Sequence, residues 1–202
     1  AEKARAEAEQ AVRATMGSDP MLVRLAQQNA ELTEQLNSVA ARLAALDAKQ
    51  AQSERLAARI AANYKREQAA KEVSGLTAGL GQLLLEHRES LPDFKAHARL
   101  AEMVEREIAA VNVSRQRHLD EAERVADLDQ AVAELAAKLP ADREPHLRGR
   151  LRDLVEQRGG LLAKQLEAEE KYLEGLAKLQ NVEGQLLEAA RAYDDFLKAN
   201  LF

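Results

Sequence analysis

Residues 22–46 read LVRLAQQNAELTEQLNSVAARLAAL, and their apolar side chains recur in alternating steps of three and four residues. When Leu22 takes heptad position a, position d falls on Leu25, and the spacing continues to Ile60. Position a is held by Leu22, Asn29, Leu36, Leu43, Gln50 and Ala57, and position d by Leu25, Leu32, Val39, Leu46, Ser53 and Ile60. Such spacing is typical of a coiled-coil helix. We therefore predict a long helix over about residues 21–72, with its strongest seam at Leu36 and Leu43.

Glycine and proline mark the ends of this helix. The segment GSDP at 17–20 precedes it, and we interpret residues 1–16 as the end of a preceding helix. Ser18 or Asp19 suits the cap position, and Pro20 suits the first turn, where its missing N–H has no partner to lose. Beyond the helix, glycines at 75, 79 and 81 break the pattern, and we expect a short helix over about 77–90 that Pro92 ends.

Two further long helices follow. Asp93 is a plausible cap for a helix over about 93–139, Pro140 to Pro145 forms a turn, and a third helix is expected over about 146–200. Gly159 and Gly160 lie inside the third helix, and we expect a bend or local unwinding there. The apolar stripe of the 93–139 helix comprises Leu100, Val104, Ile108, Val111, Leu119, Val125, Leu128, Val132, Leu135 and Leu139.

The predicted fold class is all-α. Short connections between long helices favour antiparallel neighbours, so we expect an elongated antiparallel coiled-coil bundle of three long helices with short connecting helices. Residues 17–202 would form a single domain of this kind.

Composition excludes several classes of protein. The chain has 202 residues, no Cys and no Trp, 3% aromatic residues, 31% charged residues and a formal net charge of -5. Without cysteine there is no disulfide scaffold and no thiol enzyme. The longest run of large apolar residues is Leu83-Leu84-Leu85, which is far too short to span a bilayer. A mildly acidic chain is also a poor ligand for the backbone of nucleic acids.

The four histidines do not have the spacing of a metal site. A metal-binding helical bundle places a Glu three residues before a His, but the residues there are Leu84, Phe94, Arg115 and Arg143, before His87, His97, His118 and His146 respectively. We interpret these histidines as surface or seam residues. The glycines at 75, 79 and 81 lack the Lys-Ser/Thr ending of a phosphate loop. We therefore predict no catalytic, cofactor-binding or metal-binding residue, no small-molecule substrate, and no enzyme activity.

Polar residues interrupt the predicted seams. They are Asn29, Gln50, Ser53, Arg115 and His118. One interpretation is a set of tolerated polar layers, and the alternative is control of helix register, because a buried polar residue fixes alignment at a cost in stability. The apolar stripes are narrow and lack a Lys-rich polar face opposite Trp or Phe, which fits helix partners better than a lipid surface.

Three marks in the chain resemble one known family. They are Leu80-Gly81-Gln82-Leu83-Leu84 with Arg88 and Ser90-Leu91-Pro92, then the charged stretch from Arg115 that ends in Asp127-Leu128-Asp129, then Tyr193, Phe196-Leu197 and Asn200-Leu201-Phe202. Over about residues 70–202 the chain is similar to the helical periplasmic (MscS-porin-type) region of large bacterial mechanosensitive channels. These are the KefA-like members of the MscS superfamily. Residues 1–69 match only as generic coiled coil.

The resemblance implies a function that the residues alone do not. It implies the extracytoplasmic region of a channel that opens under membrane tension and releases osmolytes in hypo-osmotic shock. This region would serve assembly, spacing or modulation of gating. The implied partners are the channel's own membrane domain and further copies of the chain, and the implied location is the periplasmic side of the inner membrane. The chain begins at Ala1, and we interpret it as a fragment. The alternative is a periplasmic coiled-coil adaptor or scaffold without channel activity.

Overall fold

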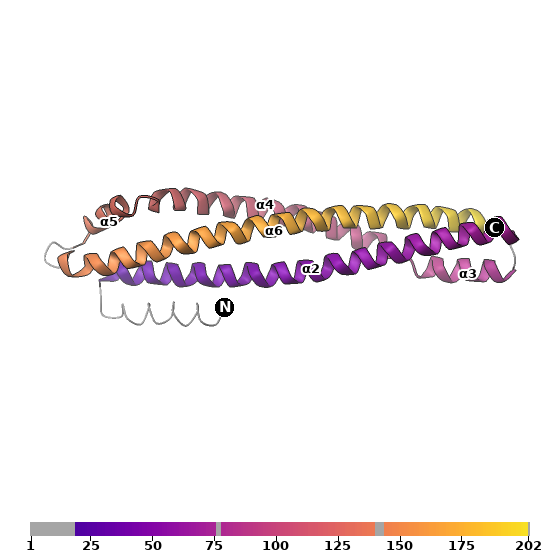
Figure 1. The fold of residues 1–202 in the computed structure, drawn as a ribbon, viewed down its shortest axis with the longest axis horizontal. Coiled ribbons are helices and arrows are strands. Elements are labelled where there is room, and N and C mark those ends of the chain that lie inside the picture. The colour runs from indigo at the N-terminus through magenta and orange to yellow at the C-terminus, as the bar shows by residue number, and fades with distance from the viewer. Residues whose placement is uncertain (1–18, 76–77, 140–143, 202) are drawn as a thin grey trace. The chain divides into compact units, whose positions relative to one another are not determined.

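The computed structural model of the chain is built from α-helices (Figure 1). It describes residues 19–75, 78–139 and 144–201, so the expectation for residues 1–16 lies outside the described part. The helices are α2 (Pro20–Ser74), α3 (Ala78–Glu89), α4 (Phe94–Val125), α5 (Leu128–Ala136) and α6 (Glu144–Asn200). The described residues contain no strand. The all-α prediction is confirmed.

The predicted helix ends are mostly correct because polar caps define them. Asp19 caps α2, since its Oδ1 accepts a hydrogen bond from the Met21 N–H at 2.9 Å. Asp93 caps α4 in the same way, with the Lys95 N–H as donor at 2.9 Å. At the other end of α2, Gly75 has a φ of 67°, a left-handed conformation that glycine adopts at little cost.

The predicted helix over 93–139 is wrong in one respect, because it is two helices. α4 ends at Val125, and α5 begins at Leu128 after a short break. Asp127 is in an extended conformation and caps α5, accepting a hydrogen bond from the Gln130 N–H at 3.0 Å. The sequence carries this signal as Asp127-x-x-Gln130, the spacing of a helix-capping box, inside a stretch whose apolar periodicity hides it.

Two expectations for the third helix are also corrected. α6 begins at Glu144 and includes Pro145, so the turn is shorter than predicted, because a proline in the first turn loses no hydrogen bond. The helix continues through Gly159 and Gly160, so the expected local unwinding is wrong. The residues on both sides of the two glycines have high helix propensity, and α6 packs along its buried face. Both effects keep the glycines in helical conformation.

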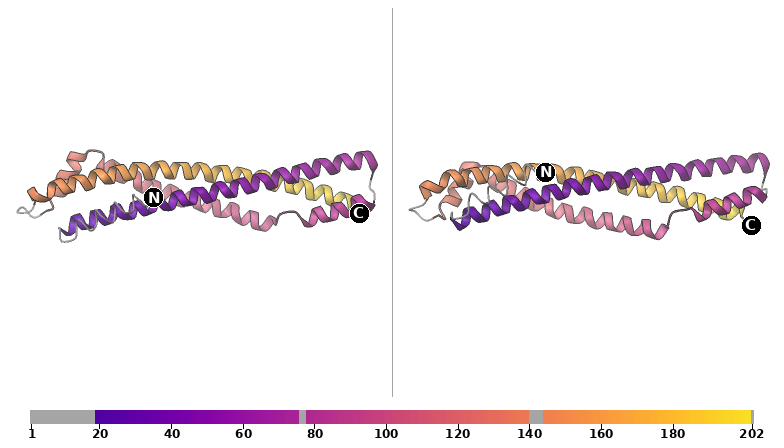
Figure 2. Two further views of the ribbon diagram at one scale, coloured as in Figure 1. Left: turned by 60° about the horizontal axis from the view of Figure 1, so that its bottom comes forward. Right: turned by 90° about the horizontal axis from the view of Figure 1, so that it is seen from below.

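Contacts divide the chain into two units. The first unit combines Ala1–Leu43 with Ala109–Leu173, and the second combines Ala44–Ile108 with Glu174–Phe202. In each unit a part of α2 and a part of α6 run in the same direction, and a part of α4 runs against them (Figures 1 and 2). The paired residues agree. In the first unit Asn29 contacts Leu154 and Arg42 contacts Tyr172, whereas in the second unit Ser53 contacts Glu183.

The buried face of α6 follows a regular spacing. Most of its buried residues occur in alternating steps of four and three, as in a heptad pattern, and Leu154 and Gly175 are buried beside them. The regularly spaced residues are Leu151, Val155, Arg158, Leu162, Gln165, Glu169, Tyr172, Leu176, Leu179, Glu183, Leu186, Ala190, Tyr193, Leu197 and Asn200. We call this set the α6 row. Several of its members are polar or charged, so the seam is not purely apolar.

The seam on α2 and α4 differs in detail from the prediction. On α2 the d positions Leu32, Val39, Leu46, Ser53 and Ile60 are buried, but the a positions Leu36 and Leu43 are only half-buried. On α4, Leu119 is 37% exposed, so its place in the predicted stripe is wrong. His118 occupies the seam there instead, because it continues the seven-residue spacing of Val104 and Val111.

Burial separates the energetic roles of two leucines in the first unit. Leu162 is fully buried, whereas Leu36 is half-buried. Leu162→Ala is expected to lower the free energy of unfolding by about 3 kcal/mol, because it leaves a cavity in a packed seam. Leu36→Ala is expected to cost about 1 kcal/mol, in proportion to its smaller buried area. Urea denaturation followed by circular dichroism measures both. Equal losses for the two variants would contradict the position of the seam.

Candidate functional site

Buried polar side chains form four groups along the helices, and they are the chemically distinctive feature of the chain. We call them polar layers and name each by its central residue. They are the Asn29 and Glu169 layers in the first unit and the Glu183 and Glu67 layers in the second. A buried polar group is costly unless it is hydrogen-bonded, so each layer has to be satisfied by side chains of neighbouring helices.

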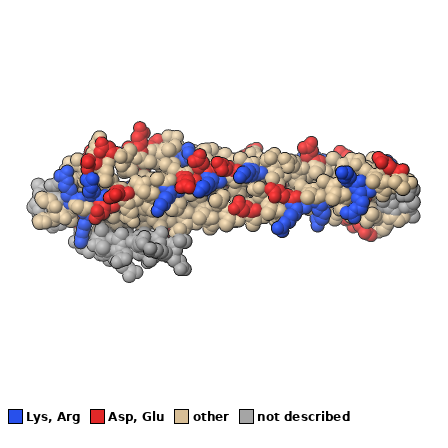
Figure 3. Space-filling view, in the orientation of Figure 1, with Lys and Arg blue, Asp and Glu red and all other residues tan. Residues whose placement is uncertain are grey.

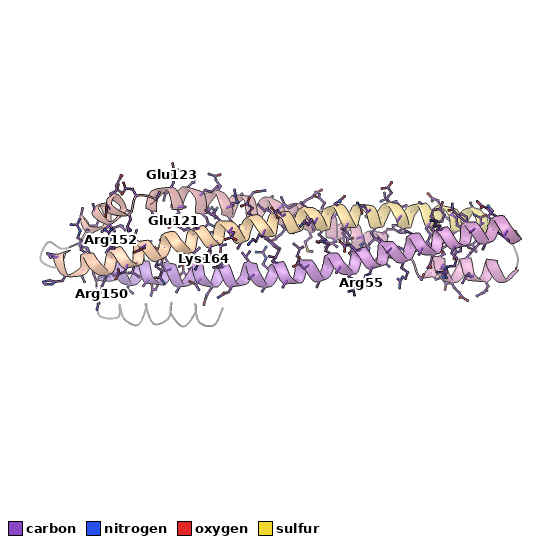
Figure 4. All side chains as sticks on the ribbon, viewed as in Figure 1. Arg55, Glu121, Glu123, Arg150, Arg152 and Lys164 are labelled. Carbon is purple, nitrogen blue, oxygen red and sulfur yellow. The ribbon has the colours of Figure 1, made fainter. Side chains whose placement is uncertain are left out.

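The Asn29 layer joins α2, α4 and α6. The Asn29 amide donates to the Leu154 carbonyl at 3.0 Å and to Gln157 Oε1 at 3.2 Å. Arg158 donates from Nη1 to Asn29 Oδ1 at 3.1 Å, and from Nε to Glu121 Oε1 at 2.6 Å. In Figure 4, Glu121 is labelled on α4, and Arg152 and Lys164 are labelled on α6, on either side of Arg158 in the sequence. The layer is therefore a continuous polar contact across three helices.

The Glu169 layer joins α4 to α6. Glu169 Oε1 accepts a hydrogen bond from the Ser114 hydroxyl at 2.9 Å, and it lies 3.0 Å from Nδ1 of His118. Gln165 donates to the same oxygen at 3.2 Å, while Oε2 is buried without a hydrogen bond. Only 3% of the Glu169 side chain and 12% of the His118 side chain are exposed. A carboxyl group so deeply buried is costly unless it has polar partners, and the hydroxyl, the imidazole and the amide provide them.

The Glu183 layer repeats this arrangement across three helices of the second unit. The buried Glu183 carboxylate accepts a hydrogen bond from Ser53 of α2 through one oxygen and contacts Nδ1 of His97 of α4 through the other. Glu183 therefore lies between the serine and the histidine. A nucleophilic site requires the histidine to contact the serine hydroxyl directly. The arrangement is consequently a structural clamp and lacks the order of a catalytic triad.

The Glu67 layer joins α2, α3 and α6. Glu67 contacts Nδ1 of His87, and the Tyr193 hydroxyl lies 3.0 Å from the same nitrogen. Burial raises the pKa of Tyr193, and the hydrogen bond and negative charge of Glu67 raise it further, so the phenol keeps its proton. Tyr193 also packs against Tyr64 at a ring-centroid distance of 5.6 Å. The layer thus anchors the short helix α3 to two long helices.

An ion-pair group lies beside the Glu67 layer. Asp194 of α6 accepts a hydrogen bond from Arg88 of α3 at 3.3 Å and contacts Lys198 at 2.5 Å. Burial raises the pKa of Asp194, but the bonds and charges of Lys198 and Arg88 outweigh burial and hold it below its usual value. This group is a second attachment of α3 to α6.

Two features of the described residues bear on chemistry at a substrate. No three His, Cys, Asp or Glu side chains among them gather closely enough to hold a metal ion. One groove of about 630 Å³ lies along α2, and Arg55 of its lining is labelled in Figure 4. Its lining residues are Ala48, Ala51, Gln52, Arg55, Leu56 and Arg59. This groove lacks a general acid–base pair and a nucleophile. On the face drawn in Figure 3, positive and negative side chains alternate, which is typical of solvated helix faces.

The structure places the histidines more precisely than the sequence did. His87, His97 and His118 lie in seams, each against a buried glutamate, and His146 is exposed. Of the predicted seam interruptions, Asn29, Ser53 and His118 belong to polar layers. Arg115 is half-buried, with Nη2 4.0 Å from Glu170, and Gln50 bonds to Glu54 at the surface.

Sequence reasoning missed the glutamates and Arg158. The signal for them is the heptad spacing itself. Extending the α2 d positions by seven from Ile60 reaches Glu67, and the α6 row includes Arg158, Glu169 and Glu183. Apolar periodicity alone does not mark these positions, because their side chains are polar or charged.

The chain was compared with protein-family models, with curated proteins and with solved structures, and none of them matches it. Within the described ranges, we find no helix with both the length and the apolar character needed to cross a bilayer.

The Glu169 layer gives a test of how these pairs contribute to stability. His118→Leu leaves the buried Glu169 carboxyl without its imidazole partner and is expected to lower the free energy of unfolding by about 3 kcal/mol. Adding Glu169→Leu is expected to recover most of that loss, because two apolar side chains need no hydrogen-bond partner. Urea denaturation of the single and double variants measures the coupling. The exposed His146→Leu serves as control and should change stability by less than about 0.5 kcal/mol. Additive losses in the double variant would contradict the pairing.

The ion pairs of Asp194 predict that the free energy of unfolding depends on pH. The pKa of Asp194 is lower in the folded than in the unfolded chain. Its ionised form therefore stabilises the fold at pH values above the usual pKa of Asp. That contribution is lost as the pH falls through the folded value. Asp194→Asn is expected to cost about 1 kcal/mol at pH 7 and to reduce the loss of stability on acidification. Urea denaturation at a series of pH values tests this. The exposed neighbour Asp195→Asn is the matched control, and an identical acid profile in both variants would refute the assignment.

Proposed function

We propose that this chain is part of the extracytoplasmic helical region of a bacterial mechanosensitive channel of the KefA-like type, in the MscS superfamily. In that role it serves assembly, spacing or modulation of gating on the periplasmic side of the inner membrane. Its partners are the channel's membrane domain and other copies of the chain. The alternative, an adaptor or scaffold of the bacterial envelope, remains the outcome to be distinguished by experiment.

The observation that carries the proposal is a contact between two of the marks of resemblance. Leu84 of the first mark and Tyr193 and Leu197 of the last mark lie in one buried cluster, although more than 100 residues separate them in the sequence. Leu91, Phe196 and Leu201 pack against the same cluster. Arg88 of the first mark contacts Asp194 beside the last. Residues that resemble the family therefore act together in the second unit, as parts of one structural feature.

The chemistry of the polar layers supports a mechanical role over a catalytic one. In the described residues the buried glutamates contact hydroxyl and imidazole groups of other helices. Such groups connect helices and do not present reactive atoms to a cleft. A protein whose distinctive residues fix helices against one another is suited to spacing and to transmitting force.

The test uses the natural full-length protein that contains this chain. It is expressed in bacteria that lack their own mechanosensitive channels, purified and reconstituted in liposomes, and membrane patches are recorded under suction. The proposal predicts tension-activated currents and rescue of the cells in hypo-osmotic shock. A natural protein without membrane spans, or one that inserts and assembles but gives no current under tension, would overturn the proposal in favour of a scaffold.

Within that protein, two adjacent leucines give a matched pair. Leu84 is 1% exposed and attaches α3 to α6, whereas Leu85 is 43% exposed. Leu84→Ala is expected to shift the tension threshold, because it weakens the attachment at the end of α6. Leu85→Ala should leave it unchanged. Thresholds are compared at equal expression, and the same threshold for both variants would show that this attachment does not influence gating.

A further inference from the structure

Three features of the first unit coincide at one level. On α6, Gly159 and Gly160 follow directly after Arg158 of the Asn29 layer. On the opposite helix, α4 ends at Val125, and a Cβ added to Gly159 would lie 3.9 Å from Cγ2 of that residue. On α2, the seam position at this level is held by Asn29 where the heptad pattern calls for an apolar residue. A glycine pair, a helix break and a polar seam therefore coincide.

Packing does not require the two glycines. A Cβ at Gly160 would meet nothing within 4 Å, and at Gly159 it would make an ordinary van der Waals contact. Neither residue has a positive φ. Alanine fits both positions and favours the helix more than glycine does. The sequence thus retains two residues that weaken α6 where the tertiary structure would accept stronger helix formers.

Each side of this level has its own attachment. On one side, α5 and the first part of α6 share an apolar cluster with the start of α2. Its buried members are Leu22, Ala26, Ala131, Val132, Ala136, Leu139, Leu151, Leu154 and Val155. Arg152 contacts Asp129 at 2.6 Å on the same side. On the other side, the Glu169 layer attaches α4 to α6. The two attachments meet at this level, where Val125 packs against the apolar cluster and Arg158 donates a hydrogen bond to Glu121.

We propose that this level is a hinge inside the first unit. Residues 144–158 of α6 move with Val125, α5 and the start of α2 as one body, against a second body formed by residues 161–173 of α6 and 109–124 of α4. The glycine pair supplies the bend in α6, the Ala126–Asp127 break supplies it between α4 and α5, and the hydrogen bonds of Arg158 and Asn29 keep the helices aligned as it bends. A polar contact suits this place because hydrogen bonds re-form after small displacements, whereas a close-packed apolar seam resists them. The proposal goes beyond the proposed function and does not depend on it.

Hydrogen exchange on this chain tests the hinge. In the unaltered chain, amides near residues 156–163 should exchange faster than those around Gly184, another α6 glycine with no atom within 4 Å of an added Cβ. Gly159→Ala with Gly160→Ala should slow exchange roughly tenfold at these amides, and also near Asn29 and Val125, because one hinge opening exposes all three. The control Gly184→Ala should slow exchange only in its own turn. Slowing confined to the substituted turn of α6 would overturn the hinge.

A distance measurement gives an independent readout. The chain has no cysteine, so spin labels can be placed at Asn112→Cys on α4 and Ala133→Cys on α5, both exposed and on opposite sides of the hinge. The hinge predicts a broad distance distribution in pulsed electron resonance, and a narrower one in the double alanine variant. Gly184→Ala should leave the width unchanged. A distribution that is equally narrow with glycine and with alanine at 159 and 160 would refute the proposal.

Discussion

Burial of acidic side chains on α6 is the constraint on which the rest of the structure depends. The α6 row carries Glu169 and Glu183 at positions where a helical seam normally has apolar residues. A buried carboxylate without hydrogen bonds and a counter-charge costs several kcal/mol, which is a large part of the stability of a typical domain. Each glutamate therefore requires polar residues opposite it, and in both cases a serine and a histidine contact its carboxyl group.

This constraint also selects one alignment of the helices. A seam of leucines repeating every seven residues accepts displacement by one heptad with little change in packing, because the same side chains meet again. The polar layers remove that degeneracy, since moving α4 by one heptad would separate His118 from Glu169 and leave both unsatisfied. The sequence alone allowed two interpretations of the polar residues, tolerated polar layers or control of helix register. These contacts favour control of register.

The sequence predicted helices well and the site poorly, for identifiable reasons. Local signals define the ends of α2 and α3. Asp19, Pro20, Gly75 and Pro92 each start or end a helix within a few residues of their own position. The break at Asp127 was missed because a cap inside an apolar repeat competes with the periodicity around it. The pairing of His97 with Glu183 depends on the path of two helices through space, and no local pattern in either helix contains it.

In the first unit, the bending of α6 can be separated from the register between the helices. The polar layers therefore have a second role beside register control. The Glu169 layer and the apolar cluster around Leu151 attach the helices on the two sides of the glycine pair, so a bend at that level does not propagate as sliding along the seam. A seam of uniform apolar packing would couple bending to sliding, because interlocked side chains along its whole length would have to move together. Bending is confined to the level of Gly159 and Gly160, because the polar contacts, the helix break and the glycines all lie there.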